Sequence, residues 1–187
     1  EEAKAGERKV FFVDAAHFVF APFFGYLWCF TRLFVRTPHG RQRLNVLGAL
    51  DAISKEVVTV INETYINATT VIELLFKLAA ANPNIPITVI LDNARYQRCN
   101  AVIECAQKLG VELLFLPSYS PNLNLIERLW KLIKKLVLAS RYYPDFKSFR
   151  GSIVDCLETL HEKHEEELKS LLTLKFQTFK KLNSQTK

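Results

Sequence analysis

Apolar residues at the start of the chain occur in short runs separated by a few polar residues, a pattern typical of strands. The run KVFFVDA begins at Lys9, is rich in valine and phenylalanine, and ends at an acid, which predicts a buried strand over residues 9–15. Aromatic and β-branched runs predict further strands over residues 25–36, 44–50 and 56–61. Because the connections between them are short, we expect these early strands to pair antiparallel.

From residue 67 onward the pattern changes to helices that alternate with strands. Apolar residues at helical spacing predict helices over residues 67–81 and 98–109, and Gly110 is suited to end the second helix. The apolar runs ITVIL and ELLFL predict strands over residues 87–91 and 112–116. Strands that alternate with helices are usually parallel, so we expect one mixed α/β sheet with helices on both faces.

The stretch SYSPNLNLIERLWKLIKKLV predicts the next helix, with Ser120 as its N-cap and Pro121 as its first residue. Glu127 lies at the edge of the apolar stripe of this helix rather than opposite it. A charged helical region is expected to follow over residues 146–181. The apolar stripe consists of Ile126, Leu129, Trp130, Ile133, Leu136 and Val137.

Composition and charge narrow the class of protein only slightly. The chain has 187 residues, enough for one domain with a sizeable core, and a net charge of +6 that weakly favours a polyanionic partner. Its four cysteines lack zinc-binding spacing and are expected to be reduced thiols in a cytoplasmic protein. The most apolar stretch, Phe18 to Phe30, is 13 residues long, whereas a membrane-spanning helix needs about 20.

Three acids form a candidate metal site. Asp14 and Asp92 each follow a buried apolar run, and parallel neighbouring strands would place their carboxylates side by side at one end of the sheet. Two like charges at that distance repel unless a cation lies between them, and ligands that are all oxygen suit Mg²⁺ or Mn²⁺. Glu127 would complete a set able to hold two ions for phosphodiester cleavage. Taken singly, each acid is equally explained as a cap, a loop residue or, for Glu127, an ion-pair partner of Lys131 or Lys134.

Three segments resemble the catalytic blocks of DDE transposases, most closely the insertion-sequence-630-type branch of the mariner-like superfamily. They are FFVDAAHF, VILDNARYQ and FLPSYSPNLNLIERLWKLIKK, and 34 residues separate Asp92 from Glu127. The resemblance covers about residues 9–140. It implies a ribonuclease H-like mixed five-stranded sheet, with three antiparallel and then two parallel strands. We therefore assign residues 1–145 to a DDE catalytic domain and residues 146–187 to a C-terminal helical extension, packed on the domain or at a subunit interface.

The resemblance assigns roles residue by residue. Asp14, Asp92 and Glu127 correspond to the catalytic, metal-binding acids, and Asn93, Asn122 and Asn124 to residues that shape the site. Many relatives have an acid directly after the first Asp, whereas this chain has Ala15. His17 is a further candidate to hydrogen-bond a phosphate or a metal-bound water, with a packed histidine as the equal alternative. Family members also carry N-terminal helix-turn-helix modules, and their absence, with the absence of methionine, predicts that the sequence is a fragment.

Two groups of basic residues are candidate DNA contacts, since such side chains bind phosphates without reading sequence. Arg128, Lys131 and Lys135 form a stripe beside Glu127, and a solvated helix face explains that stripe equally well. The second group lies in the loop over residues 36–43, which we expect at the far end of the sheet from the metal site. It consists of Arg36, Arg41 and Arg43.

The expected function is therefore that of a DNA transposase. We expect hydrolysis of a phosphodiester at transposon ends with two Mg²⁺ or Mn²⁺ ions, and then attack of the freed 3′-hydroxyl on target DNA. Expected partners are the terminal inverted repeats, target DNA and at least a second copy of the chain. The alternatives are a nuclease or resolvase of the same fold and a non-catalytic DNA-binding protein derived from a transposase.

Overall fold

A five-stranded sheet in the order β3-β2-β1-β4-β5 forms the centre of the computed structural model, which describes residues 1–20, 30–31, 42–117 and 120–176. β1 (Lys9–Phe20) pairs antiparallel with β2 (Gln42–Asp51), and β2 pairs antiparallel with β3 (Val57–Asn62). On its other side β1 pairs parallel with β4 (Ile87–Leu91), which pairs parallel with β5 (Val111–Phe115). The expected mixed sheet of three antiparallel and then two parallel strands is confirmed.

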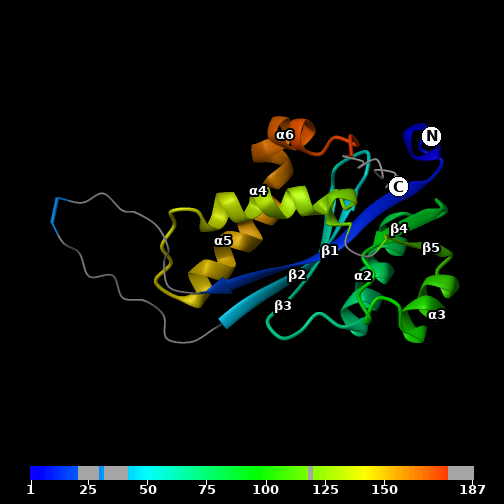
Figure 1. The fold of residues 1–187 in the computed structure, drawn as a ribbon, viewed down its shortest axis with the longest axis horizontal. Helices are drawn as coiled ribbons and strands as arrows, with labels where there is room; N and C mark the ends of the chain where they lie inside the picture. Colours follow the sequence, from blue (N-terminus) through cyan, green and yellow to red (C-terminus); the bar gives the residue numbers. More distant parts are fainter. Residues whose placement is uncertain (21–29, 32–41, 118–119, 177–187) are drawn as a thin grey trace, which may run out of the picture.

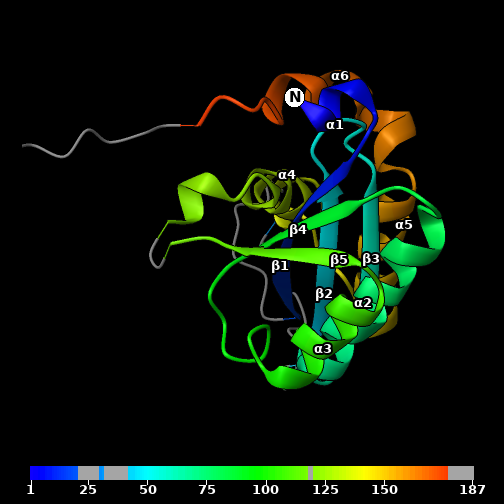
Figure 2. The ribbon, with the colours of Figure 1, turned by 90° about the vertical axis from the view of Figure 1, so that its right-hand side faces the viewer.

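Helices cover both faces of the sheet (Figures 1 and 2). α2 (Ala68–Ala81) and α3 (Asn100–Lys108) pack on one face, which we call the α2 face. α4 (Ile126–Leu138), α5 (Phe146–Glu158) and α6 (Leu160–Leu171) build the core on the other, the α4 face. None of these helices, nor the short α1 (Glu2–Ala5), is long and apolar enough to cross a bilayer.

Side chains of β1 alternate between the two cores, because successive residues of a strand point to opposite faces. Phe11 and Val13 belong to the core beneath α2, whereas Phe12, Ala16 and Phe18 belong to the core beneath α4. The same alternation places Asp14 on the α4 face.

β1 is longer than the expected strand of residues 9–15, so the expectation that Asp14 ends its strand is wrong. On one side, β1 pairs with β2 as far as Phe20, opposite Gln42. On the other side, its pairing with β4 stops at Val13, opposite Leu91. The edge that carries Asp14 is therefore the end of the β1–β4 ladder and lies in the middle of β1. The expected strand over residues 25–36 lies outside the described residues except for positions 30 and 31, which form a bend.

The helix boundaries differ from expectation in two places. Ser120 and Pro121 open a 3₁₀ turn (η1, Pro121–Leu123), in which the Leu123 N–H donates to the Ser120 carbonyl at 3.0 Å, and α4 begins only at Ile126. The charged C-terminal region consists of two helices, α5 and α6, that meet at Thr159, and α6 ends at Leu171. Residues 177–181 of the expected region lie outside the described residues. Both helices belong to the α4-face core, through Phe149, Ile153 and other apolar residues.

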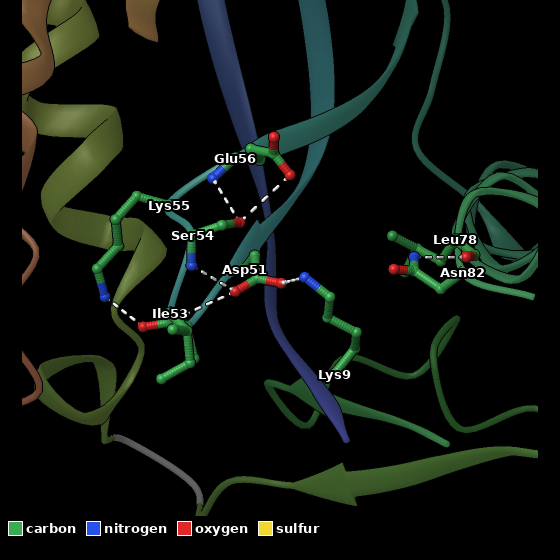
Figure 3. Close-up of polar contacts among 9 residues, drawn as sticks. Lys9, Asp51, Ile53, Ser54, Lys55, Glu56, Leu78 and Asn82 are labelled. Carbon is green, nitrogen blue, oxygen red and sulfur yellow. Dashed lines mark hydrogen bonds and ion pairs between the residues drawn. The ribbon is translucent and has the colours of Figure 1, made fainter. Parts of the chain in front are cut away.

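Asp51, at the end of β2, is 1% exposed and holds the turn into β3 (Figure 3). Its carboxylate accepts hydrogen bonds from the N–H groups of Ile53 at 2.7 Å and Ser54 at 2.8 Å, and pairs with the Lys9 ammonium at 3.0 Å. Burial acts to raise the pKa of Asp51, but these donors outweigh it and the net pKa is lowered. Asp51 is therefore a structural carboxylate, fully partnered by its own chain.

Candidate active site

Asp14 and Asp92 lie side by side because of the register between two parallel strands. Val13 on β1 is opposite Leu91, the last residue of β4, so the next residue on each chain is an acid. Neighbouring strands are about 4.8 Å apart. The chain leaves the sheet at Asp92, where the β1–β4 ladder ends, and the charge of Asp92 acts on Asp14.

Glu127 reaches the same region from the first turn of α4. The loop before α4 is tied to β1 by Asn124, whose side-chain N–H donates to the Val13 carbonyl at 3.1 Å. Leu125 and Ile126 are fully buried and hold the start of the helix against the sheet. The same short segment therefore anchors itself beside Asp14 and presents Glu127 there.

The charge state of Asp14 reflects this crowding. Burial raises the pKa of Asp14, a hydrogen bond from the Ala15 N–H lowers it, and the charges of Glu127 and then Asp92 raise it further. The Trp130 indole lowers the pKa slightly, and the net value is about 7. Two other carboxylates are thus close enough to destabilise the ionised form of Asp14.

The three acids do not form a closed cage for a cation. Among the described residues, no three acidic, histidine or cysteine side chains converge closely enough to enclose an ion. Mg²⁺ keeps several of its waters and uses one or two protein carboxylates, so a site for this ion does not require such a cage.

Unpaired amide oxygens adjoin the acids. Asn93 follows Asp92 and donates to the Leu116 carbonyl at 2.6 Å, while its Oδ1 is buried without a hydrogen-bond partner among the described residues. Asn124 leaves its Oδ1 equally unpaired after donating to Val13. A buried acceptor without a donor is costly, and a water bound to a cation would supply one. The donor set, oxygen only and rich in negative charge, therefore fits Mg²⁺ or Mn²⁺.

Trp130 covers the site from α4. It is 2% exposed, and its ring lies against Gly48, the residue of β2 directly opposite Asp14. A Cβ at Gly48 would lie 2.7 Å from two carbons of the Trp130 ring, well inside van der Waals contact. Only glycine at this position lets the indole lie on the sheet beside Asp14. A glycine inside a strand marks close approach of another group, and this signal was available in the sequence.

Comparison with known families and structures agrees with this geometry. The family model described as DDE superfamily endonuclease matches residues 9–150. This chain belongs to that family. A comparison with curated proteins found no match.

Solved structures share the fold of this DDE domain at low sequence identity. The Mos1 mariner paired-end complex with Mn matches with a TM-score of 0.59 and 15% identity, over 94% of this chain and 57% of that one. The Mos1 strand transfer complex matches at 0.58 and 16%, over 93% and 56%. The HTLV-2 integrase catalytic core with magnesium matches at 0.54 and 14%, over 84% and 87%. These likenesses confirm the ribonuclease H-like fold, and the DDE domain spans a little over half of the Mos1 chains.

His17 does not join the acids of the DDE domain. It lies three residues after Asp14, an odd separation that puts its side chain on the α2 face of the sheet. There its Nδ1 is 2.7 Å from Oδ1 of the buried Asn45, which also donates to the Thr64 carbonyl. The expected contact of His17 with a phosphate or bound water at the acids is therefore wrong for this structure, because strand alternation separates the two. Asn122 lies exposed in η1.

Arg128 is engaged by the protein itself. Its guanidinium donates to the carbonyls of Leu171 at 3.3 Å, Thr173 at 2.8 Å and Lys175 at 2.8 Å, and lies over the Phe176 ring. The expected role of Arg128 in the basic stripe with Lys131 and Lys135 stays a prediction, because these contacts show only what its guanidinium binds within the chain. Arg128 holds the segment after α6, while the other two side chains are exposed.

Arg43 also lies elsewhere than expected. It is the second residue of β2, opposite Val19 near the end of β1, and its guanidinium lies over the Tyr65 ring at 4.9 Å. We expected Arg43 at the end of the sheet opposite the acids. That end carries Lys9, whereas Arg43 lies at the other end of β1. The cause is the extra length of β1, which continues past Asp14 to Phe20, opposite Gln42 at the start of β2. Arg36 and Arg41 lie outside the described residues.

Tyr96 is a neighbour of the acids that sequence reasoning did not assign to the site. Burial, then the charges of Asp92 and Asp14, raise the pKa of its hydroxyl to about 12. Next to it Gln97 is fully buried, with both side-chain polar atoms lacking a hydrogen-bond partner in the described part of the chain. The loop after Asp92 thus carries polar groups into the interior.

Proposed function

We propose that this DDE domain is the catalytic part of a DNA transposase. It hydrolyses a phosphodiester bond at transposon ends and then directs the freed 3′-hydroxyl onto target DNA. The observation that supports the proposal is the surroundings of Asp14, a carboxyl at the end of the β1–β4 ladder whose pKa is raised to about 7 by burial and by the charges of Glu127 and Asp92. A protein has little reason to gather such charges unless a cation balances them.

In this proposal the three acids hold two Mg²⁺ or Mn²⁺ ions. Bound there, the ions would activate a water or 3′-hydroxyl and stabilise the leaving oxygen. Asp14 is fixed by its strand, and both other acids act on its charge. Asp92 and Glu127 sit where a chain leaves the sheet and where a helix begins, so each approaches from a different side. Asn124 keeps Glu127 in register with Asp14 by holding the Val13 carbonyl.

Partners are proposed by likeness and by charge. The Mos1 complexes were solved with Mn, with Mg and with a transposon end, which supports divalent ions, DNA and paired subunits for this chain as well. The exposed Lys131 and Lys135 on α4, near Glu127, and the exposed Arg43 are proposed phosphate contacts. The pattern Y-S-P-x-L-N-x-I-E-x-L-W supports the insertion-sequence-630-type branch. The boundary near residue 145 stays a prediction.

The first experiment is Mn²⁺ titration by calorimetry on the wild type, Asp92→Asn and the matched control Asp51→Asn. The control removes one carboxylate of the same sheet that lies outside the site. We expect wild type and Asp51→Asn to bind equally, and Asp92→Asn to bind at least about 100-fold more weakly, as for loss of a ligand. Equal binding by all three proteins would rule out Asp92 as a ligand.

A second assay separates the transposase from a nuclease of the same fold. The chain is incubated with Mn²⁺, the inverted-repeat duplex that flanks its coding sequence and a target plasmid. Cleaved ends joined to the plasmid support the transposase, and cleavage without joining supports the nuclease. DNA binding with neither reaction supports a non-catalytic descendant.

A further inference from the structure

Trp130 carries a buried indole N–H that makes no hydrogen bond of regular geometry among the described residues. The side chain is 2% exposed, and the nearby Asp14 carboxyl is the acceptor whose pKa the indole lowers. Leaving a buried N–H without a well-formed hydrogen bond is unfavourable. A phenylalanine would fill most of the same space without this cost, so the nitrogen needs its own explanation.

Gly48 determines where that nitrogen lies. The Trp130 atoms nearest to Gly48 are Cζ2 and Cη2, each 2.7 Å from the position of a Cβ, and Cζ2 is bonded to the carbon that carries Nε1. Directly paired residues of antiparallel strands place their side chains on the same face, about 5 Å apart. Gly48 is paired with Asp14. The nitrogen side of the indole therefore lies over the position next to the Asp14 carboxyl.

We propose that Trp130 is a positioning residue: its indole N–H donates to one oxygen of the Asp14 carboxylate and leaves the other oxygen for a divalent cation. The inference rests on the proposed function, since it assigns a role at the same metal site. The Trp130 ring is fixed by packing against Gly48, so a rotation of the Asp14 carboxyl group would complete the bond. The stabilising effect of the indole on ionised Asp14 agrees with this arrangement.

The bond itself is tested without any metal. In the ¹⁵N-labelled chain the two indole N–H signals are assigned with Trp28→Phe, and the Trp130 signal is then followed in Asp14→Ala and in the control Asp51→Ala. We expect Asp14→Ala to shift the Trp130 signal and speed its exchange with water, while Asp51→Ala leaves it in place. An unmoved signal in Asp14→Ala overturns the bond.

The positioning role is tested by Mn²⁺ affinity in Trp130→Phe. Loss of a side chain that orients a ligand typically weakens metal binding about 10–100-fold, so we expect at least a 10-fold loss. The matched control is Ile133→Val, on the same face of α4, which lowers stability without touching Asp14. Wild-type affinity in Trp130→Phe, or an equal loss in Ile133→Val, overturns the role.

Failure of the proposed function and failure of the positioning role of Trp130 give different results. If the wild type binds no Mn²⁺ with or without DNA, the proposed function fails, and the indole signal still decides whether Trp130 bonds to Asp14. A bond without metal binding would make it a structural contact and overturn the positioning role. Metal binding without the bond leaves the proposed function standing and removes Trp130 from it.

Discussion

Two carboxylates of the central sheet, Asp51 and Asp14, have opposite surroundings and opposite pKa shifts. Asp51 is surrounded by donors of its own chain, two backbone N–H groups and the Lys9 ammonium, which lower its pKa. Asp14 has two further carboxylates as neighbours, and its pKa is raised to about 7. The difference separates a carboxylate that holds the fold together from one whose partner has to come from outside the chain.

Catalysis gives the largest expected contrast between them. Asp14→Asn removes a proposed ligand, so we expect metal-dependent DNA cleavage to fall by more than about 100-fold, while Asp51→Asn keeps near wild-type activity. Both substitutions remove one negative charge, which controls for a general charge effect. The measurement is the initial rate of cleavage of an end duplex with Mn²⁺. Equal loss in both variants would contradict the distinction between the two acids.

In metal-free protein, Asp14→Asn and Asp51→Asn are expected to change the free energy of unfolding in opposite directions. At pH 8 Asp14 is ionised against its neighbours, so Asp14→Asn should raise the free energy of unfolding by roughly 1–3 kcal/mol. Asp51→Asn should lower it by roughly 1–3 kcal/mol, because it removes the ion pair to Lys9 from a buried group. Urea unfolding with a chelator present measures both. A destabilised Asp14→Asn would show that the three acids do not strain the fold.

The two acids also differ in their pH dependence. The pKa of Asp51 is lowered, so its contribution to stability is present above the ordinary value of 3.8 and is lost as pH falls below it. The pKa of Asp14 is raised, so metal-free protein loses stability as pH rises from about 4 to about 7. Each slope should vanish in the corresponding Asn variant when unfolding is measured across these pH ranges.

Two glycines, one beside the site and one far from it, are expected to differ in the effect of an added methyl group. A methyl group at Gly48 meets the Trp130 ring at 2.7 Å, so Gly48→Ala should cost roughly 1–3 kcal/mol and weaken Mn²⁺ binding. Gly151 in α5 has no atom within 4 Å of a Cβ, and Gly151→Ala should stabilise by roughly 0.5–1 kcal/mol. Thermal unfolding and Mn²⁺ titration of both variants test this. An unaffected Gly48→Ala would mean that Trp130 need not lie on the sheet.

Substitution of a basic residue near the acids is expected to have the smallest effect on stability. Lys9 faces Asp51, whereas Arg128, next in sequence to Glu127, donates to the carbonyls after α6. Arg128→Ala should therefore destabilise the chain by roughly 1–2 kcal/mol, and Lys131→Ala should not. Hydrogen exchange should show the loss of protection around residues 171–176. A pure loss of DNA binding in Arg128→Ala, with stability unchanged, would support it as a DNA contact.

The amino-acid sequence alone predicted the sheet type and the alternation of strands and helices after residue 67, and it proposed the three candidate acids, because local periodicity and the spacing of motif blocks record them. Tertiary structure decided which side chains meet. Strand alternation sent His17 to the other face from Asp14, and ladder lengths placed Asp14 in mid-strand. Contacts between α4, the sheet and the C-terminal segment turned Arg128 inward and set Trp130 on Gly48. Such contacts join residues far apart in the chain, and no local pattern encodes them.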